Sequence, residues 1–115
     1  MHVTHVFAGI AVSDFTAARD WYERLFDSPP DMFPTEGEAV WRPTASASIY
    51  ITVDPERAGR ALLTLAVKDL ENERTKLVQR GLVVEDGAVP HGPRTLIVRD
   101  PDGNTIKLFE DPSSA

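Results

Sequence analysis

The sequence contains no cysteine among its 115 residues. Disulfide bonds, thiolate metal ligands and cysteine nucleophiles are therefore excluded for this chain. Histidine is also scarce, with three copies, and it is the side chain that most often binds transition metals or transfers protons near neutral pH. A metal site or an acid–base site would have to be built mainly from other residues.

The sequence has no long apolar run either. No stretch approaches the roughly 18 apolar residues that mark a membrane-spanning helix. The first residues also lack the apolar core of a secretory signal. We therefore expect a cytoplasmic protein with no membrane partner.

Positive charge is outnumbered by negative charge. The chain has 12 Lys and Arg against 18 Asp and Glu, which gives a formal net charge of −6. Because nucleic-acid-binding proteins usually carry a basic face, we expect no nucleic-acid partner. An acidic surface promotes solubility and mildly favours neutral or cationic small ligands.

Two pairs of short segments resemble each other. GIAVSDF at 9–15 is similar to TLAVKDL at 64–70, with an offset of 55 residues. IYI at 49–51 is similar to IKL at 106–108, with an offset of 57 residues. The shared order and the nearly equal offsets indicate two copies of one structural unit.

The length and the repeat together predict a single domain over residues 1–115, since a hydrophobic content of 42% is enough for one core. Module one covers about 3–53 and module two about 61–110. The short polar segment 54–60 links them.

Module one is predicted to begin with a strand at 4–12. Asp14 can cap the helix that follows, because its carboxylate can accept an unpaired backbone N–H. Apolar residues recur at helical spacing from Phe15 to Phe26, and Pro29 cannot continue the helix. Short strands are then expected at 31–35, 38–42 and 47–53.

Module two shows the same order. A strand at 61–67 precedes the cap Asp69, a helix at 70–80 and a stop at Gly81. The segment PDGN at 101–104 predicts a hairpin turn, because Pro presets φ and Gly supplies a positive φ. The strands expected after the helix are 83–88, 95–99 and 104–109. The β-α-β-β-β order of each module predicts an α+β fold.

At this point the sequence resembles a known family. The segments that carry the resemblance are HVFAGIAVSDFTAARDWYERLF, LLTLAVKDLENERTKLVQRG and LIVRDPDGNTIKLFE, and they look like the vicinal oxygen chelate superfamily. Its members include glyoxalase I, extradiol dioxygenases, fosfomycin-resistance enzymes and bleomycin-resistance proteins. The resemblance implies two βαβββ modules that form a curved mixed sheet around a cleft, with the helices on the outer face. It also implies a homodimer.

Enzymes of this superfamily bind a divalent metal through His, Glu or Gln side chains on the first and last strands of each module. The resemblance places these positions at Phe7, Tyr50, Leu62 and Lys107. Phe and Leu have no donor atom, Tyr is a poor ligand near neutral pH, and Lys carries a repelling positive charge. We therefore predict no metal and no cofactor.

Strand alternation indicates which side chains face the cleft. Phe7, Tyr50 and Phe109 fall on the cleft face, and Trp41 is expected to reach it. Such rings can stack on planar ligands and attract cationic ones. His91, in the loop VPHGPR, could act as a general base, and Arg94 could bind an anionic group. The full predicted ligand-binding set is Phe7, Trp41, Tyr50, Leu62, Thr64, His91, Arg94, Lys107 and Phe109.

Three functions fit these residues. The first is a binding protein of the bleomycin-resistance type that sequesters an aromatic or cationic natural product, such as an antibiotic, without turnover. The second is a lyase, isomerase or dioxygenase-like enzyme that uses Lys107, Tyr50 or His91 for acid–base chemistry. The third is an interaction or regulatory protein whose cleft is filled. We take the first, with a small-molecule partner and a homodimer, as the working hypothesis.

Overall fold

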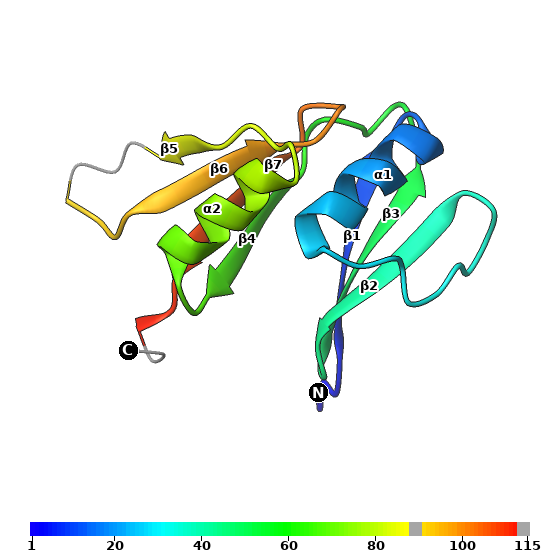
Figure 1. The fold of residues 1–115 in the computed structure, drawn as a ribbon. Coiled ribbons are helices and arrows are strands. Elements are labelled where there is room, and N and C mark those ends of the chain that lie inside the picture. Colours follow the sequence, from blue (N-terminus) through cyan, green and yellow to red (C-terminus); the bar gives the residue numbers. More distant parts are fainter. Residues whose placement is uncertain (88–90, 113–115) are drawn as a thin grey trace.

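The computed structural model describes residues 1–87 and 91–112, and in them two helices each lie against one face of a mixed β-sheet (Figure 1). The elements in chain order are β1 (Val6–Val12), α1 (Phe15–Phe26), β2 (Glu38–Thr44), β3 (Ala47–Val53), β4 (Leu62–Val67), α2 (Leu70–Gln79), β5 (Glu85–Gly87), β6 (Thr95–Arg99) and β7 (Thr105–Glu110). Module one comprises β1 to β3 with α1, and module two comprises β4 to β7 with α2.

The two sheets follow one plan. Their strand orders are β1-β3-β2 in module one and β4-β7-β6-β5 in module two. In each sheet the first strand pairs in parallel with the last, and the other pairs are antiparallel. A parallel pair needs a crossover connection, which the helix supplies. The predicted α+β fold is confirmed.

The strand expected at 31–35 is wrong. From this segment only Met32 forms an isolated bridge, to Val40. Pro34 has no N–H to donate to a ladder, and the side chains of Met32 and Phe33 are 50% and 49% exposed. Among the described residues, the sheet of module one therefore has three strands and that of module two has four. In module two, β5 begins two residues later than expected, and residue 88 lies outside the described residues.

Both helices begin where the capping residues predict. The side chain of Asp14 accepts a hydrogen bond from the backbone N of Ala17, and Asp69 does the same for Asn72, each at 3.1 Å. Both capping residues have extended backbone angles, as N-caps require. Gly81 follows α2 with a φ of 86°, the left-handed conformation that favours glycine at a helix end. None of the helices in the described ranges is long and apolar enough to cross a membrane.

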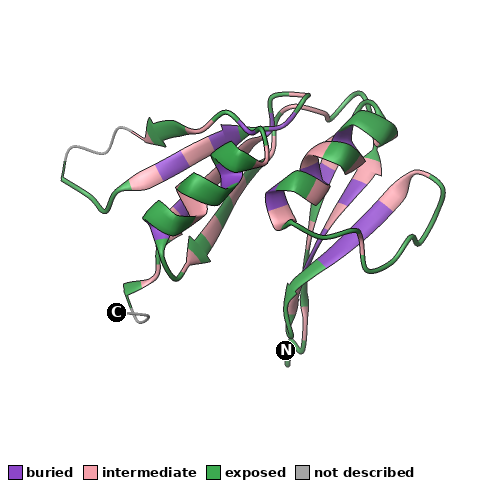
Figure 2. Cartoon of the chain, in the orientation of Figure 1, coloured by how far each residue is buried: buried purple, intermediate pink, exposed green. Residues whose placement is uncertain are grey.

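The aliphatic face of each sheet packs against its helix, as strand alternation predicts. Figure 2 shows the buried parts of the strands beneath the helices and exposed residues on the outer helix turns. The branched aliphatic strand residues that are 4% exposed or less are Ile10, Val12, Ile49, Ile51, Leu96, Val98, Ile106 and Leu108. In the described ranges, neither helix covers the opposite face of a sheet (Figure 1).

The turn between β6 and β7 also joins the two modules. The Asp100 carboxylate accepts hydrogen bonds from the Tyr22 hydroxyl and from the Asn104 side-chain amide, both at 2.8 Å. The Asn104 amide also donates to the backbone carbonyl of Ala11 at 2.9 Å. Burial, together with the charge of Asp100, raises the pKa of Tyr22 above its ordinary value. Because Tyr22 and Ala11 belong to module one, the predicted hairpin turn fixes the modules to each other as well as connecting two strands.

Candidate functional site

Most of the predicted site residues lie on the sheet faces that carry no helix. In module one, Gly9 stands opposite Tyr50, and Phe7 is two residues earlier on the same face of β1. In module two, Thr64 stands opposite Lys107, and Ala66 stands opposite Phe109. Leu62 shares this face with Thr64 by strand alternation. We call these two surfaces the open faces.

Large apolar side chains are exposed on the open faces. Phe7 is 59% exposed and Leu62 is 66% exposed, whereas Tyr50, Lys107 and Phe109 are half-buried. Water-exposed apolar groups of this size favour contact with a ligand or with another protein surface. The open faces therefore keep the mixed polar and apolar character that their sequence predicts.

His5 and Gly9 also lie on the open face of module one, although neither belongs to the predicted ligand-binding set. The ring of His5 lies 4.5 Å from that of Phe7, and its Nε2 is 2.8 Å from the hydroxyl of Ser48. A Cβ atom at Gly9 would lie 2.5 Å from Cζ of Tyr50, so only glycine lets the Tyr50 ring lie this close to β1. The alternation of residues 5, 7 and 9 along one strand was the available signal.

Trp41 does not reach the open face, which corrects the expectation made for it. Trp41 stands opposite Ile49, on the helix side of its sheet, and is 1% exposed. Its ring lies 5.9 Å from that of Tyr22 and 5.8 Å from that of Phe26. The indole N–H donates to the backbone carbonyl of Ser28 at 3.0 Å. Trp41 therefore acts as a core residue of module one.

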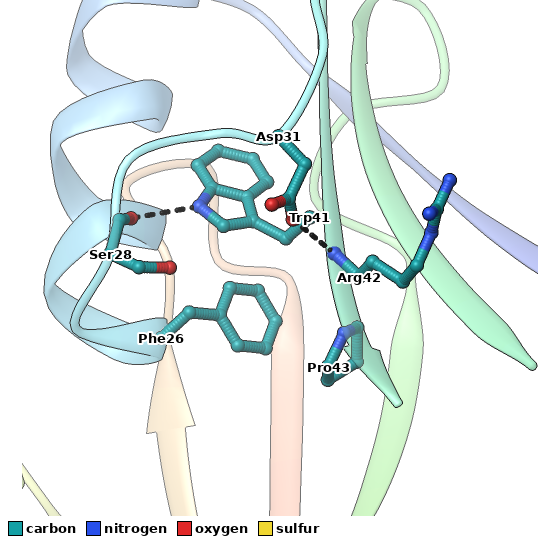
Figure 3. A pocket seen from close by; sticks show the side chains of 6 residues that line it. All are labelled: Phe26, Ser28, Asp31, Trp41, Arg42 and Pro43. Atoms are coloured by element: carbon teal, nitrogen blue, oxygen red, sulfur yellow. Dashed lines mark hydrogen bonds between the residues drawn. The ribbon is translucent and has the colours of Figure 1, made fainter. Parts of the chain in front are cut away.

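A pocket of about 330 Å³ lies beside Trp41 at the end of α1. Figure 3 shows its lining, formed by Phe26, Ser28, Asp31, Trp41, Arg42 and Pro43. The Asp31 carboxylate accepts a hydrogen bond from the backbone N of Arg42 at 2.7 Å. This bond and the one from Trp41 to Ser28 hold the segment after α1 against β2. The polar groups of this pocket thus serve the local fold.

A larger pocket of about 650 Å³ lies between the modules. Its walls come from α1 and β1 to β3 on one side and from α2, β4 and β7 on the other, and most of its strand residues belong to the helix-facing side of the sheets. Aliphatic side chains such as Leu25, Leu63, Leu65 and Leu77 line it. Of the nine predicted ligand-binding residues, Thr64 alone lines this pocket.

His91 and Arg94 lie apart from the open faces. Both are exposed. Nη1 of Arg94 lies 2.6 Å from Glu71 and its Nη2 lies 3.5 Å from Asp86. The hydrogen bond and charge of Glu71 raise the pKa of Arg94 further. These carboxylates occupy the guanidinium group, which leaves less of it to bind an anion. Within residues 1–87 and 91–112, no hydrogen bond joins Tyr50, His91 and Lys107.

The four positions that the resemblance assigns to metal ligands do not fit a metal. Phe7 and Leu62 present carbon atoms only, and the ammonium of Lys107 repels a cation. In the described part of the chain, no group of three or more His, Cys, Asp or Glu side chains lies close enough together to hold a metal ion. No catalytic step through a metal is therefore derived for these positions.

The comparisons with known proteins agree with this architecture. The family model of the Glyoxalase/Bleomycin resistance protein/Dioxygenase superfamily matches residues 2–108. The chain belongs to this superfamily. No curated protein matches the chain.

Solved structures of the superfamily superpose on most of the chain. A glyoxalase/bleomycin resistance protein from Catenulispora acidiphila is 38% identical, covers 94% of this chain and 98% of its own, and gives a TM-score of 0.87. TnmS3, an antibiotic binding protein from Streptomyces sp. CB03234, is 25% identical, with coverage of 96% and 98% and a TM-score of 0.79. The bleomycin resistance determinant encoded on transposon Tn5 is 17% identical over 92% and 96%, with a TM-score of 0.72, and shares the fold.

Proposed function

We propose that this superfamily member binds a small natural product with an aromatic or cationic part and holds it without chemical change. One observation carries the proposal: Phe7 and Leu62 are 59% and 66% exposed on the open faces, where neither contributes to the helix-side core. Exposed apolar side chains of this size mark interaction sites more often than they support a fold. TnmS3 is described as an antibiotic binding protein, which supports a small natural product as the ligand.

The residues around Phe7 suit a planar ligand. The rings of Phe7 and His5 are 4.5 Å apart, and the ring of Tyr50 lies across Gly9. Aromatic rings on one surface can stack on a planar ligand and attract a positive charge. The net charge of −6 also favours a cationic ligand over an anionic one. On the open face of module two, Lys107 would donate to a carbonyl or phenolic oxygen of the same ligand.

We also infer that the protein works as a homodimer and without a metal. The open faces are exposed in a single chain, and a second copy would enclose a ligand that lies on them. The side chains at the four ligand positions supply no metal-binding donors of the usual kind. Binding would then be stoichiometric, and the bound compound would be recovered unchanged.

A thermal-shift screen with planar, aromatic and cationic natural products tests this proposal. A compound whose free concentration is one hundred times its dissociation constant stabilises the folded state by about 2.7 kcal/mol, which is easily detected. We expect stabilisation that is indifferent to divalent metals and to a chelator. Phe7→Ala and Leu62→Ala should each weaken binding by about tenfold while the melting temperature of the free protein stays nearly unchanged.

Two results would contradict the proposal. A metal-dependent shift that a chelator removes would mean that the metal-ligand assignment is wrong. Conversion of the compound, seen by mass spectrometry of the recovered ligand, would favour an enzyme, and a bell-shaped pH profile would then point to acid–base groups such as Lys107, Tyr50 or His91.

A further inference from the structure

The pocket between the modules is a separate feature from the open faces. Its volume of about 650 Å³ lies within the range of roughly 300–1,000 Å³ that is typical of pockets for drug-sized ligands. Most of its strand side chains belong to the helix-facing side of the sheets, whereas Phe7 and Tyr50 lie on the opposite face and do not line it. A ligand on the open faces therefore leaves this pocket accessible.

The walls of the pocket are concave and mostly apolar. Leu63, Leu65 and Val67 of β4 form one wall, and each of them is half-buried. Phe26 of α1 and Ala8 of β1 lie on the other side and are also half-buried. Partly exposed apolar side chains that face each other across a gap favour an apolar ligand between them.

Charge in the pocket is of one sign. Of the residues that line it, the charged ones are Glu73 and Asp111. Glu73 lies one helical turn before Leu77, so both side chains project from the same side of α2. In the described part of the chain, no side chain pairs with the carboxylate of Glu73 by a hydrogen bond or an ion pair. A half-buried carboxylate at the edge of an apolar pocket attracts a cation that brings its own hydrogen-bond donors.

We propose that this pocket is a second ligand site, which takes a drug-sized apolar amine with its protonated nitrogen on Glu73. The apolar body of the ligand lies between α1 and β4, in contact with Phe26 and Leu65. The proposal goes beyond the function proposed for the open faces, because the residues that would hold the ligand, Glu73, Phe26 and Leu65, are not part of the open faces.

A second copy of the chain is the competing occupant. A second copy would have to bring a cationic side chain into the apolar pocket to pair with Glu73, whereas a small amine carries its own charge and hydrogen-bond donors. The half-buried walls also form a hollow, whereas interfaces between identical subunits match one patch with its own copy. These observations favour a small cation over a second copy.

Two related dyes test the proposal. The probe is 9-aminoacridine, which is a planar cation near neutral pH, and acridine is its neutral counterpart. Binding is measured by probe fluorescence. Glu73→Gln should lower the affinity for 9-aminoacridine by about tenfold and leave the affinity for acridine unchanged, because the substitution removes the negative charge and keeps the shape of the side chain. Glu71→Gln removes an exposed charge from the same helix and should change either affinity by about twofold or less.

A pocket-filling variant locates the site independently of charge. Leu65→Trp should lower the affinity for both dyes by more than about tenfold, since the larger side chain occupies the space between β4 and α1. Val78→Ala, at an exposed position of α2 outside this pocket, should leave both affinities unchanged. Because Glu73→Gln is conservative and half-exposed, it keeps the test decisive even where Leu65→Trp folds poorly.

Three results would overturn the proposal. The first is binding that survives both Leu65→Trp and Glu73→Gln. The second is binding that Phe7→Ala abolishes, which would place the dye on the open face and support the proposed function instead. The third is a dimer in sedimentation that Leu65→Trp converts to a monomer, which would make a second copy the occupant. Dye binding that depends on Glu73 in a protein that binds no natural product on its open faces would keep this proposal and reject the earlier one.

Discussion

Module one and module two repeat the same order of elements, but their cores are built differently. Helix α1 buries Ala18, Tyr22 and Leu25, whereas α2 buries Leu70 and Leu77. The two modules also differ across the sheet: Trp41 stands opposite Ile49 in module one, and Val98 stands opposite Ile106 in module two. One backbone plan therefore tolerates an aromatic core in one copy and an aliphatic core in the other.

The open faces differ in the same way. The pair Gly9 and Tyr50 in module one corresponds to the pair Thr64 and Lys107 in module two. Module one thus offers a ring that lies across a strand, and module two offers a hydroxyl and an ammonium. If the chain arose from two copies of one unit, the copies have taken complementary surface chemistry on the same backbone.

The largest expected effect concerns the two cores. Trp41→Ala should lower the free energy of unfolding by about 3–5 kcal/mol, because it removes a fully buried ring and its contacts with Tyr22 and Phe26. The matched change in module two, Val98→Ala, should cost about 2 kcal/mol, since it removes two methyl groups from a buried site. Urea unfolding followed by circular dichroism measures both. A smaller loss for Trp41 than for Val98 would reverse the comparison.

The next effect concerns the contact that joins the modules. Tyr22→Phe removes one hydrogen bond to the charged Asp100, and it should cost about 1.5–3 kcal/mol. Leu77 is the buried residue that α2 presents at the corresponding place, and it makes no such bond. Hydrogen exchange should report the loss at the start of β7 and near Ala11 together, because Asn104 connects them. A loss confined to α1 would show that the modules are held by other contacts.

The same contact predicts a dependence of stability on alkaline pH. Burial raises the pKa of Tyr22 in the folded protein, while in the unfolded chain it returns to about 10. The contribution of Tyr22 to the free energy of unfolding is therefore fully present below about pH 10, where its hydroxyl is protonated in both the folded and the unfolded state. Above that pH it falls by up to about 1.4 kcal/mol per pH unit, because only the unfolded state ionises.

A comparison of the protein with Tyr22→Phe checks this prediction. The stability difference between the two proteins should shrink as the pH rises from about 9 to about 11. At pH values where both proteins are still folded, the rise in tyrosinate absorbance with pH should be the same in the two proteins. The reason is that Tyr22 stays protonated in the folded state. An extra titrating tyrosine in the folded wild-type protein would mean that Tyr22 is accessible to solvent.

Local rules made much of the fold predictable. Capping by Asp14 and Asp69 and the alternation along β1, β3, β4 and β7 depend on residues within a few positions of each other. The segment 31–35 failed because apolar content suggested a strand, while Pro34 and the lack of a surface to cover Met32 decided otherwise.

The site was less predictable because it depends on contacts that are distant in the sequence. The segment 101–104 predicts a turn, but no local pattern predicts the bond between the adjacent Asp100 and Tyr22, 78 residues away, which joins the modules. The pocket between the modules depends on how the modules are placed relative to each other, so no short sequence motif predicts it. The face of Trp41 was hard to predict because Ala39, Val40 and Trp41 are all buried, so this part of β2 shows no alternation of buried and exposed residues.

The smallest expected effect separates the two open faces. Gly9→Ala places a Cβ atom 2.5 Å from the Tyr50 ring, and the outer end of that ring can swing away. The free energy of unfolding should therefore change by less than about 1 kcal/mol, but the ring should leave its place across β1. Thr64→Ala, at the corresponding position of module two, adds no atom and should leave Lys107 where it is.

If Tyr50 takes part in binding, Gly9→Ala should lower the affinity for the natural product by more than Thr64→Ala does. Isothermal titration of both variants measures this difference. Equal affinities in the two variants would remove Tyr50 from the site and leave Phe7 and Leu62 as its apolar anchors.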